Sequence, residues 1–365
     1  MYLSTSIPAE VVDQITSVYP NRTIVISLAE GTSLDTMELI AALKGHEIPF
    51  IGGVFPKIIF GDQTYESGMI ITTFDNVQHT FLVEGLDTSA PQIPEMEVHP
   101  SGKYFLFTFA DGLANNLSSY LSELYSHSGS NLSYFGCGAG SLSLEQMPCV
   151  FNEDGIYQDA AVRILVKSNI ALGVRHGWAR VTGPLIATKT ERNVIHQINW
   201  QNAFEVYQSI VEDHGKQSIT RDNFFEISKA YPFGILKDDT EYVVRDSIAV
   251  NDQGGLVCVG DVTENTVLDV LHGRQEDLVE AAKSAAQAVI GHLENPRQAY
   301  ISDCISRVLF LEDNYSKELE AVVETLHQNG RKIPVEGALT LGEISSFGDG
   351  YLQVFNKTIV IGLFE

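Results

Sequence analysis

The chain has 365 residues, of which 44% are hydrophobic and 19% charged, and its formal net charge is -24. This composition is typical of a globular protein long enough for two domains, and it excludes a disordered chain. So acidic a surface repels phosphate backbones and anionic lipid, so we expect no nucleic-acid partner and no membrane partner.

The four cysteines are scattered and form no C-x-x-C pair, which indicates reduced thiols and a cytoplasmic location. The first twenty residues contain no basic segment followed by an apolar run, so we expect no signal peptide. The uncharged apolar runs are also shorter than the ~20 residues that a membrane span requires.

Three stretches share one order of predicted elements, namely strand, helix, strand, glycine-containing corner and hairpin. They occupy residues 23–74, 104–166 and 300–364. Their helices are predicted from apolar residues at i, i+3, i+4 and i+7, and their hairpins from turn residues such as Asp154-Gly155 and Gly348-Asp349-Gly350. The corners fall at Gly52-Gly53, Gly136-Cys137-Gly138 and Gly337. Either the chain contains an internal duplication, or the three stretches share only the general pattern of α/β proteins.

Between the second and third stretches, the sequence predicts a helix that starts near residue 201, then strands in 241–250 and 254–262. A long alanine-rich helix in 276–293 follows. We therefore predict an α/β (α+β) fold of two domains, 1–215 and 216–365, each with mixed, largely antiparallel sheets packed with helices and with internally repeated strand-helix-strand-hairpin units.

The most unusual group of side chains lies between two strand-like runs in residues 171–190. There His176 stands between Arg175 and Gly177, with Trp178 two residues further on and on the same face of an extended chain. Arg180 follows. A histidine in this context is either a hydrogen-bonded structural residue or a metal or cofactor ligand.

Two other groups could take part in a site. Cys137, in the glycine-rich run 136–141, is either a small buried residue or a nucleophile or soft metal ligand. Asp303, Cys304 and Arg307 are predicted to alternate along one strand, and an inward-facing Arg307 would need an acidic partner, for which Glu343 is the candidate. An enzyme built from Cys137, His176 and Glu343 is therefore one hypothesis.

Several segments together carry a resemblance to a known family. The run FGCGAGSLSLEQMPCVFNEDGIYQDAAVRILV, followed by GVRHGW, VTGP and TERNVIHQINWQNAFEVY, resembles the N-terminal half of FIST proteins. FFEISKAYPFGIL, VRDSIAVNDQGGLVCVGDV, DCISRVLFL and GALTLGEI resemble the FIST C-terminal half, in the family's order. The motifs are individually weak, but their order extends from about residue 20 to the end.

The resemblance implies a signal-transduction sensor and not an enzyme. FIST proteins are regarded as intracellular modules that sense small ligands, and a subgroup without an attached output domain binds haem, senses nitric oxide and controls a separate histidine kinase. Membership of that subgroup would imply haem b with His176 as the iron ligand. Arg175 or Arg180 would then meet a propionate, and Trp178 would line the porphyrin, with Cys137 close to the site. The alternative is a FIST sensor of a small metabolite such as an amino acid. A homodimer is left open.

Overall fold

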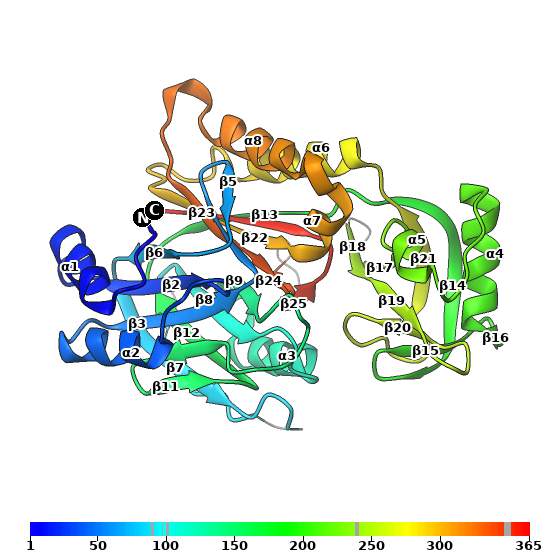
Figure 1. The fold of residues 1–365 in the computed structure, drawn as a ribbon, viewed down its shortest axis with the longest axis horizontal. Coiled ribbons are helices and arrows are strands. Elements are labelled where there is room, and N and C mark those ends of the chain that lie inside the picture. The colour runs from blue at the N-terminus through cyan, green and yellow to red at the C-terminus, as the bar shows by residue number, and fades with distance from the viewer. Residues whose placement is uncertain (89–90, 97, 100–101, 238–240, 347–351) are drawn as a thin grey trace.

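The computed structural model describes residues 1–365 except 89–90, 97, 100–101, 238–240 and 347–351. Three six-stranded sheets with their helices form a body, and an eight-stranded sheet with two helices forms a smaller part beside it (Figure 1). Most strand pairs are antiparallel. The predicted α+β fold with mixed, largely antiparallel sheets is therefore confirmed.

Each sheet of the body is built on the same plan. Sheet 1 has the order β1-β6-β2-β3-β10-β11, sheet 2 the order β7-β12-β8-β9-β24-β25, and sheet 3 the order β13-β26-β22-β23-β4-β5. The strands of sheet 1 are β1 (Tyr2–Leu3), β6 (Met69–Phe74), β2 (Thr23–Ala29), β3 (Phe50–Phe55), β10 (Val150–Asn152) and β11 (Gly155–Tyr157). Those of sheet 2 are β7 (Val77–Glu84), β12 (Ala160–Val166), β8 (Tyr104–Asp111), β9 (Leu132–Ala139), β24 (Glu343–Ser346) and β25 (Leu352–Phe355). Those of sheet 3 are β13 (Ile170–Arg175), β26 (Ile359–Phe364), β22 (Gln298–Cys304), β23 (Val335–Thr340), β4 (Lys57–Phe60) and β5 (Gln63–Tyr65).

The repeated units exchange their hairpins. The β4-β5 hairpin of the first unit joins the sheet of the third, the β10-β11 hairpin of the second joins the first, and β24-β25 of the third joins the second. The glycine corners occupy equivalent places: Gly52, Gly136 and Gly337 pair in parallel with Ile26, Thr108 and Ile301 on the strands before them. The predicted repeat is thus present in the order and register of the strands. The predicted turn at Gly348-Asp349-Gly350 lies outside the described residues.

The inner faces of the three sheets share one aromatic core. Phe74 of sheet 1, Phe105 of sheet 2 and Phe364 of sheet 3 meet with ring centroids 5.1 to 5.5 Å apart. The strands that supply this core are runs of apolar residues buried on both faces, such as β8, every residue of which is buried. Such runs favour strands enclosed between layers.

The outer faces are covered by helices. The helices α1 (Pro8–Val18) and α2 (Thr36–Gly45) cover sheet 1, α3 (Leu117–Ser128) covers sheet 2, and α6 (Gln275–Val289) and α8 (Tyr315–Leu326) cover sheet 3. The Asp35 carboxylate caps α2 by accepting from the amide of Met37 at 2.8 Å. The sequence did not predict α1 or α7 (Ile305–Leu311). The strand predicted through Arg307 is wrong, because it ends at Cys304 and a helix begins there.

The smaller part comprises residues 179–272. Its sheet contains β14 (Ala179–Glu191), β15 (Val194–Ile198), β16 (Gln201–Asn202), β17 (Phe233–Lys237), β18 (Glu241–Arg245), β19 (Ser247–Val250), β20 (Leu256–Cys258) and β21 (Val267–His272), and its helices are α4 (Ala203–Gly215) and α5 (Phe224–Ser228). Both halves of the sequence contribute to the body and to the smaller part. The predicted boundary between a first domain, 1–215, and a second domain, 216–365, stays a prediction.

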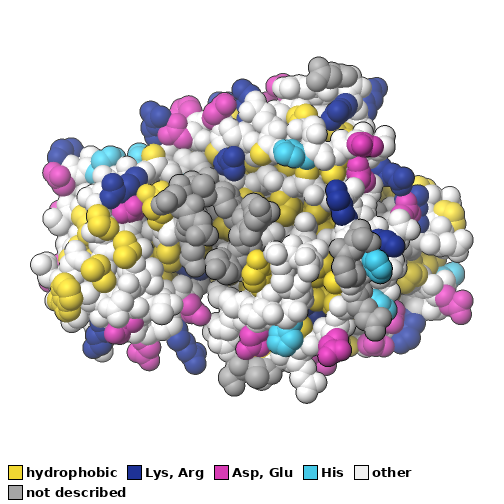
Figure 2. Space-filling model, turned by 180° about the vertical axis from the view of Figure 1, so that it is seen from behind, with side chains coloured by type: hydrophobic (Ala, Val, Ile, Leu, Met, Phe, Trp, Pro, Cys, Tyr) yellow, Lys and Arg dark blue, Asp and Glu magenta, His cyan; other side chains and the backbone are white. Residues whose placement is uncertain are grey.

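On the face seen in Figure 2, acidic and basic side chains are interspersed, and apolar side chains gather over the smaller part. The large hydrophobic residues that the smaller part exposes are Trp200, Phe225, Leu236 and Val267. No helix in the described part of the chain is long and apolar enough to cross a membrane.

Candidate functional site

His176 lies where the chain passes from the body to the smaller part. Arg175 ends β13, which pairs with β26 of the body, and Ala179 begins β14, which pairs with β21 of the smaller part. The intervening Gly177 has a φ of +83°, and a side chain there would meet the backbone of α6 at about 3.0 Å. A glycine is therefore required at this bend, because an L side chain would be both strained and crowded.

The imidazole of His176 is buried and already accepts a hydrogen bond. Its Nδ1 atom accepts from the backbone N–H of Trp178 at 2.8 Å, and its ring lies edge-on to Tyr242 at 6.0 Å. Burial, together with the nearby charges of Arg307 and Arg175, lowers the pKa of His176 to about 3. The ring is therefore neutral near pH 7. Since Nδ1 is an acceptor, the proton lies on Nε2.

Trp178 is packed among protein groups. Its indole N–H donates to the carbonyl of Lys357 at 3.1 Å, and its ring lies 4.9 Å from the ring of Phe310. The ammonium of Lys357 lies 4.9 Å from the indole centroid, and the backbone of Gly273 packs against the same ring. Gly273 follows β21, the second strand that joins the two parts. Trp178 therefore connects both chain crossings to the end of the body's β25-β26 turn.

The other predicted site residues lie nearby but face different groups. Arg175 donates to the carbonyl of its neighbour Val174 at 2.7 Å. Arg180 forms an ion pair with Asp269 at 2.9 Å, and Asp269 also accepts from the hydroxyl of Tyr242 at 2.7 Å. The structure thus brings Arg175, His176, Trp178 and Arg180 together along one connection.

Cys137 belongs to the core between the sheets. It pairs with Glu343 across β9 and β24, and burial raises the pKa of its thiol. Within the described residues, neither Cys137 nor Glu343 is hydrogen-bonded to His176. The carboxylate of Glu343 instead accepts from the hydroxyl of Thr340 at 2.7 Å and from the amide of Thr358 at 3.3 Å. The arrangement that a nucleophile, base and orienting acid would need is not formed by these three side chains.

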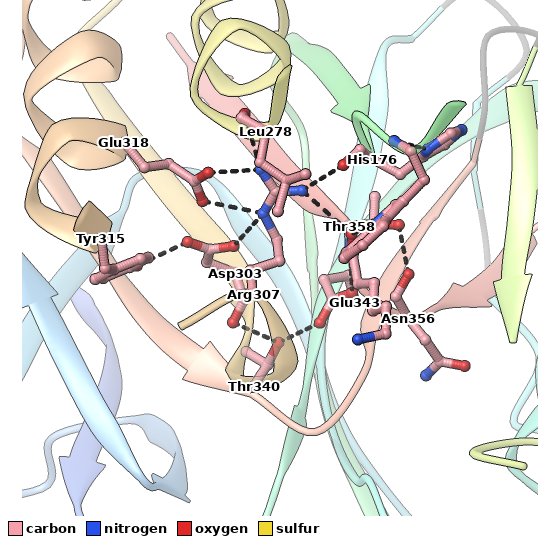
Figure 3. A network of polar contacts seen from close by, with 12 residues as sticks. His176, Leu278, Asp303, Arg307, Tyr315, Glu318, Thr340, Glu343, Asn356 and Thr358 are labelled. Carbon is pink, nitrogen blue, oxygen red and sulfur yellow. Dashed lines mark hydrogen bonds and ion pairs between the residues drawn. The ribbon is translucent and has the colours of Figure 1, made fainter. Parts of the chain in front are cut away.

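Arg307 is the centre of a buried network next to His176 (Figure 3). Its guanidinium donates to both carboxylate oxygens of Glu318, at 3.0 and 2.6 Å, and Asp303 lies 3.4 Å away. The expected acidic partner of Arg307 is therefore present, but the pairing with Glu343 is wrong. The same guanidinium donates to the carbonyl of His176 at 2.6 Å and to the carbonyls of Leu278 and Lys357 at 3.0 and 3.2 Å. All three nitrogens of the guanidinium donate hydrogen bonds, and together they hold the loop of His176 against α6, α8 and Lys357 of the β25-β26 turn.

Lys357 is a second buried charge, and no sequence pattern marks it as part of a site. Its ammonium pairs with Asp246 at 3.0 Å and donates to the carbonyl of Lys229 at 2.9 Å. Lys357 belongs to the body, whereas Asp246 and Lys229 belong to the smaller part. No periodicity marks these residues, because Lys357 lies in the turn between β25 and β26, more than 100 positions from Asp246 and Lys229 in the chain.

A separate groove of about 540 Å³ opens between the start of β8 and β9 and the edge strand β13. Its lining includes Lys103, Ser130, Asn131, Ser133 and His292, and it contains none of the predicted site residues. Among the residues that the structure describes, no three His, Cys, Asp or Glu side chains gather as a metal site.

Comparison with known families identifies two domains. The FIST N domain model matches residues 60–201, and the FIST C domain model matches residues 203–346. No curated protein matches the sequence. The two matches follow one another in the family's order and together span most of the chain, and they include the connection that carries His176 and the network around Arg307. FIST domains are signal-transduction sensor domains, and this chain is a FIST-domain protein.

Proposed function

We propose that this chain is a sensor in which a bound small ligand changes the junction between the body and the smaller part. The observation that carries this proposal is the construction of the junction. Two chain crossings lie side by side there, since Ala179 pairs with His272, and they are held by the packing of Trp178 on Gly273. Paired connections of this kind form a hinge, and a ligand that prefers one arrangement of the two parts shifts the population of that arrangement.

Buried charges at the junction limit the body and the smaller part to a few defined relative positions. The Lys357–Asp246 pair and the contact of Arg307 with the His176 carbonyl lie where the two parts meet. Separating them would leave charges without partners in the interior, which is strongly unfavourable. The parts therefore favour defined positions over gradual bending. A sensor needs such an element to convert binding into a signal.

The proposed output is a separate histidine kinase or another signalling protein. The exposed apolar side chains of the smaller part, Trp200 among them, are suited to contact such a partner. The partner contact would then lie on the smaller part, next to the junction that responds to the ligand.

The ligand is either haem b, which would let the protein sense nitric oxide, or a small metabolite such as an amino acid. In the haem proposal, His176 binds the iron and Arg175 or Arg180 meets a propionate. Bound haem would supply an iron atom that binds the gas. As the residues lie here they do not fit that role, because the Nδ1 lone pair is used by the Trp178 amide and Nε2 carries the proton. The indole of Trp178 also packs on protein groups. These contacts favour a small metabolite over haem as the ligand. Haem binding through His176 would require the 176–178 loop to rearrange.

Titration of the purified protein with hemin separates the two ligands. A saturable Soret band that His176→Ala removes, and that a control variant at the exposed His79 keeps, would support haem. Absence of a specific band would leave the metabolite sensor. In that case thermal-shift screening with free amino acids, followed by hydrogen exchange of residues 172–180 and 270–276, tests whether the ligand acts on the junction. A ligand that binds without changing exchange there would contradict the proposed hinge.

A further inference from the structure

Arg163 of β12 is a fully buried arginine that has no hydrogen-bond partner among the described residues. Its side chain lies under α3, on the outer face of sheet 2, with 0% of its surface exposed. Within the described part of the chain, none of its three guanidinium nitrogens donates to any acceptor, and the neighbouring hydroxyl of Tyr120 has no partner either. Buried polar groups in folded proteins are almost always paired, so four unpaired atoms in one place require an explanation.

The repeat of the body provides an internal comparison for this position. Arg163 pairs with Thr108 on the strand that precedes the Gly136 corner, and the equivalent residues of sheets 1 and 3 are Ile71, opposite Ile26, and Ile361, opposite Ile301. Both isoleucines are buried in the layer between sheet and helices. The fold therefore needs only an aliphatic side chain here, and the arginine is a feature of the second unit alone.

The other fully buried cations of the described residues show what a purely structural charge looks like in this protein. Arg307 contacts Glu318 and Asp303, and Lys357 contacts Asp246. Among the described residues, the neighbours of the Arg163 guanidinium in the structure are aromatic rings, with Phe81 and Tyr120 centred 5.4 and 5.8 Å from its guanidinium carbon. Contact with rings offsets part of the lost hydration of a cation but offers no acceptor to its N–H groups. Burial accordingly lowers the pKa of Arg163.

We propose that Arg163 and Tyr120 form a buried binding site for a small monoanion, with a monocarboxylate as the best-matched class. The guanidinium can donate two parallel hydrogen bonds to a carboxylate, and the Tyr120 hydroxyl is a third donor. One buried positive charge balances one negative charge, whereas a dianion such as phosphate would keep an uncompensated charge. The surrounding Phe81, Tyr120 and Tyr134 are suited to an aromatic or otherwise apolar body on the ligand.

This site goes beyond the proposed function. It lies between sheet 2 and α3, away from the connection that carries His176, so it stands or falls independently of the hinge and of haem. Because Arg163 is covered, entry of a ligand requires α3 or the neighbouring apolar side chains to move apart transiently.

The test uses the whole chain and its thermal unfolding in benzoate, chloride and phosphate at equal ionic strength. Benzoate should raise the Tm of the wild type by at least about 2 °C, and the increase should grow with the logarithm of its concentration. Arg163→Ile, which copies the two equivalent positions, should fold with undiminished stability in weakly binding buffer and lose the benzoate response. Ile361→Val serves as the matched control, with a lower Tm and the same response to benzoate as the wild type.

The remaining outcomes also decide the proposal. If chloride stabilises the wild type through Arg163 and benzoate does not, the site takes an inorganic monoanion. Should Arg163→Ile fail to fold, Tyr120→Phe replaces it and should weaken the benzoate response while Arg163 stays in place. The proposal is overturned if no monoanion stabilises the wild type, if phosphate alone does so, or if the wild type and the substituted protein respond equally.

Discussion

The ammonium of Lys357 lies 3.0 Å from a carboxylate oxygen of Asp246, and neither side chain is exposed by more than 2%. The first residue belongs to the body and the second to the smaller part. The same ammonium donates to the carbonyl of Lys229 and lies over the indole of Trp178. A single buried cation therefore joins the two parts of the molecule to the connection between them.

Replacing Lys357 by Met should lower the free energy of unfolding by about 3–5 kcal/mol, because Asp246 would be left as a buried charge without its partner. Urea unfolding at pH 7 measures the loss. Lys216→Met is the matched control, since Lys216 has the same left-handed backbone and its ion pair with Asp213 is exposed. The control should change stability by less than about 1 kcal/mol. Equal losses in the two variants would show that the buried pair is not responsible.

The same substitution should change the pH dependence. Burial raises the pKa of Asp246, and Lys357 opposes this shift. A carboxyl group whose folded pKa is raised stabilises the fold below its unfolded pKa, and this contribution is lost as the pH rises through the folded pKa. Without Lys357 the pKa of Asp246 should rise further, so the deficit of Lys357→Met should be smaller near pH 4 than at pH 7. Adding Asp246→Asn should recover stability at pH 7, and failure to do so would contradict this account.

The thiols should be unreactive in the folded protein. All four cysteines are free and buried, and burial raises the pKa of Cys137, Cys149, Cys258 and Cys304. Labelling with a thiol-specific disulfide reagent at pH 8 should be slow in the native state and should count four thiols in urea. Rapid native labelling of Cys137 would support the enzyme hypothesis that the geometry disfavours.

The three repeated units could be predicted from the sequence because short segments of the chain contain the patterns that identify them. Apolar runs followed by glycine identify the three units, and the corner glycines are needed because the paired strand leaves no room for a side chain. Helix α7 could not be separated from a strand, because Ile305, Val308 and Leu311 lie in a short apolar run that fits both periods. The exchange of hairpins between the units could not be predicted from the sequence either, since no local pattern tells whether β4 pairs within its own unit or with β23.

In the candidate site too, the sequence predicts residues that are close together in the chain but not their long-range partners. Arg175, His176, Trp178 and Arg180 can be identified from the sequence because they lie within six consecutive positions of the chain. Their partners Lys357 and Arg307 depend on long-range packing, and Arg307 pairs with Glu318 because both lie on helices outside sheet 3. Arg163 had no sequence signal at all, and only comparison with Ile71 and Ile361 in the folded repeat makes it stand out.

The corner glycines provide a steric prediction. A Cβ atom at Gly136 would clash with the carbonyl of Thr108, and its distance to the Thr108 Cβ would be 3.1 Å. Gly136→Ala should therefore destabilise the protein by about 1–3 kcal/mol, as overpacking does elsewhere. Gly45→Ala is the control, because Gly45 ends α2 and nothing lies within 4 Å of its added Cβ. The control should be neutral or stabilise by up to about 1 kcal/mol. Unfolding free energies in urea would show the contrast, and a tolerant Gly136 would rule out steric need as the reason for the corner.

His176 should make the stability of the protein depend on pH. Its pKa is about 3 in the folded state, lowered by burial and by Arg307 and Arg175, against an ordinary value of 6.5. The unfolded chain therefore binds a proton between these values while the folded chain does not. Stability from this group is complete above pH 6.5 and is lost as the pH falls, by about 1.4 kcal/mol per pH unit.

His176→Asn keeps an acceptor for the Trp178 amide but does not titrate, so its unfolding free energy should fall less steeply between pH 6.5 and 4.5. His79→Asn, at an exposed position of β7, should behave as the wild type. If the unfolding free energies of all three proteins fall equally with pH, His176 binds a proton in the folded state as readily as in the unfolded chain. The hydrogen bond from the Trp178 amide to Nδ1 would then be wrong.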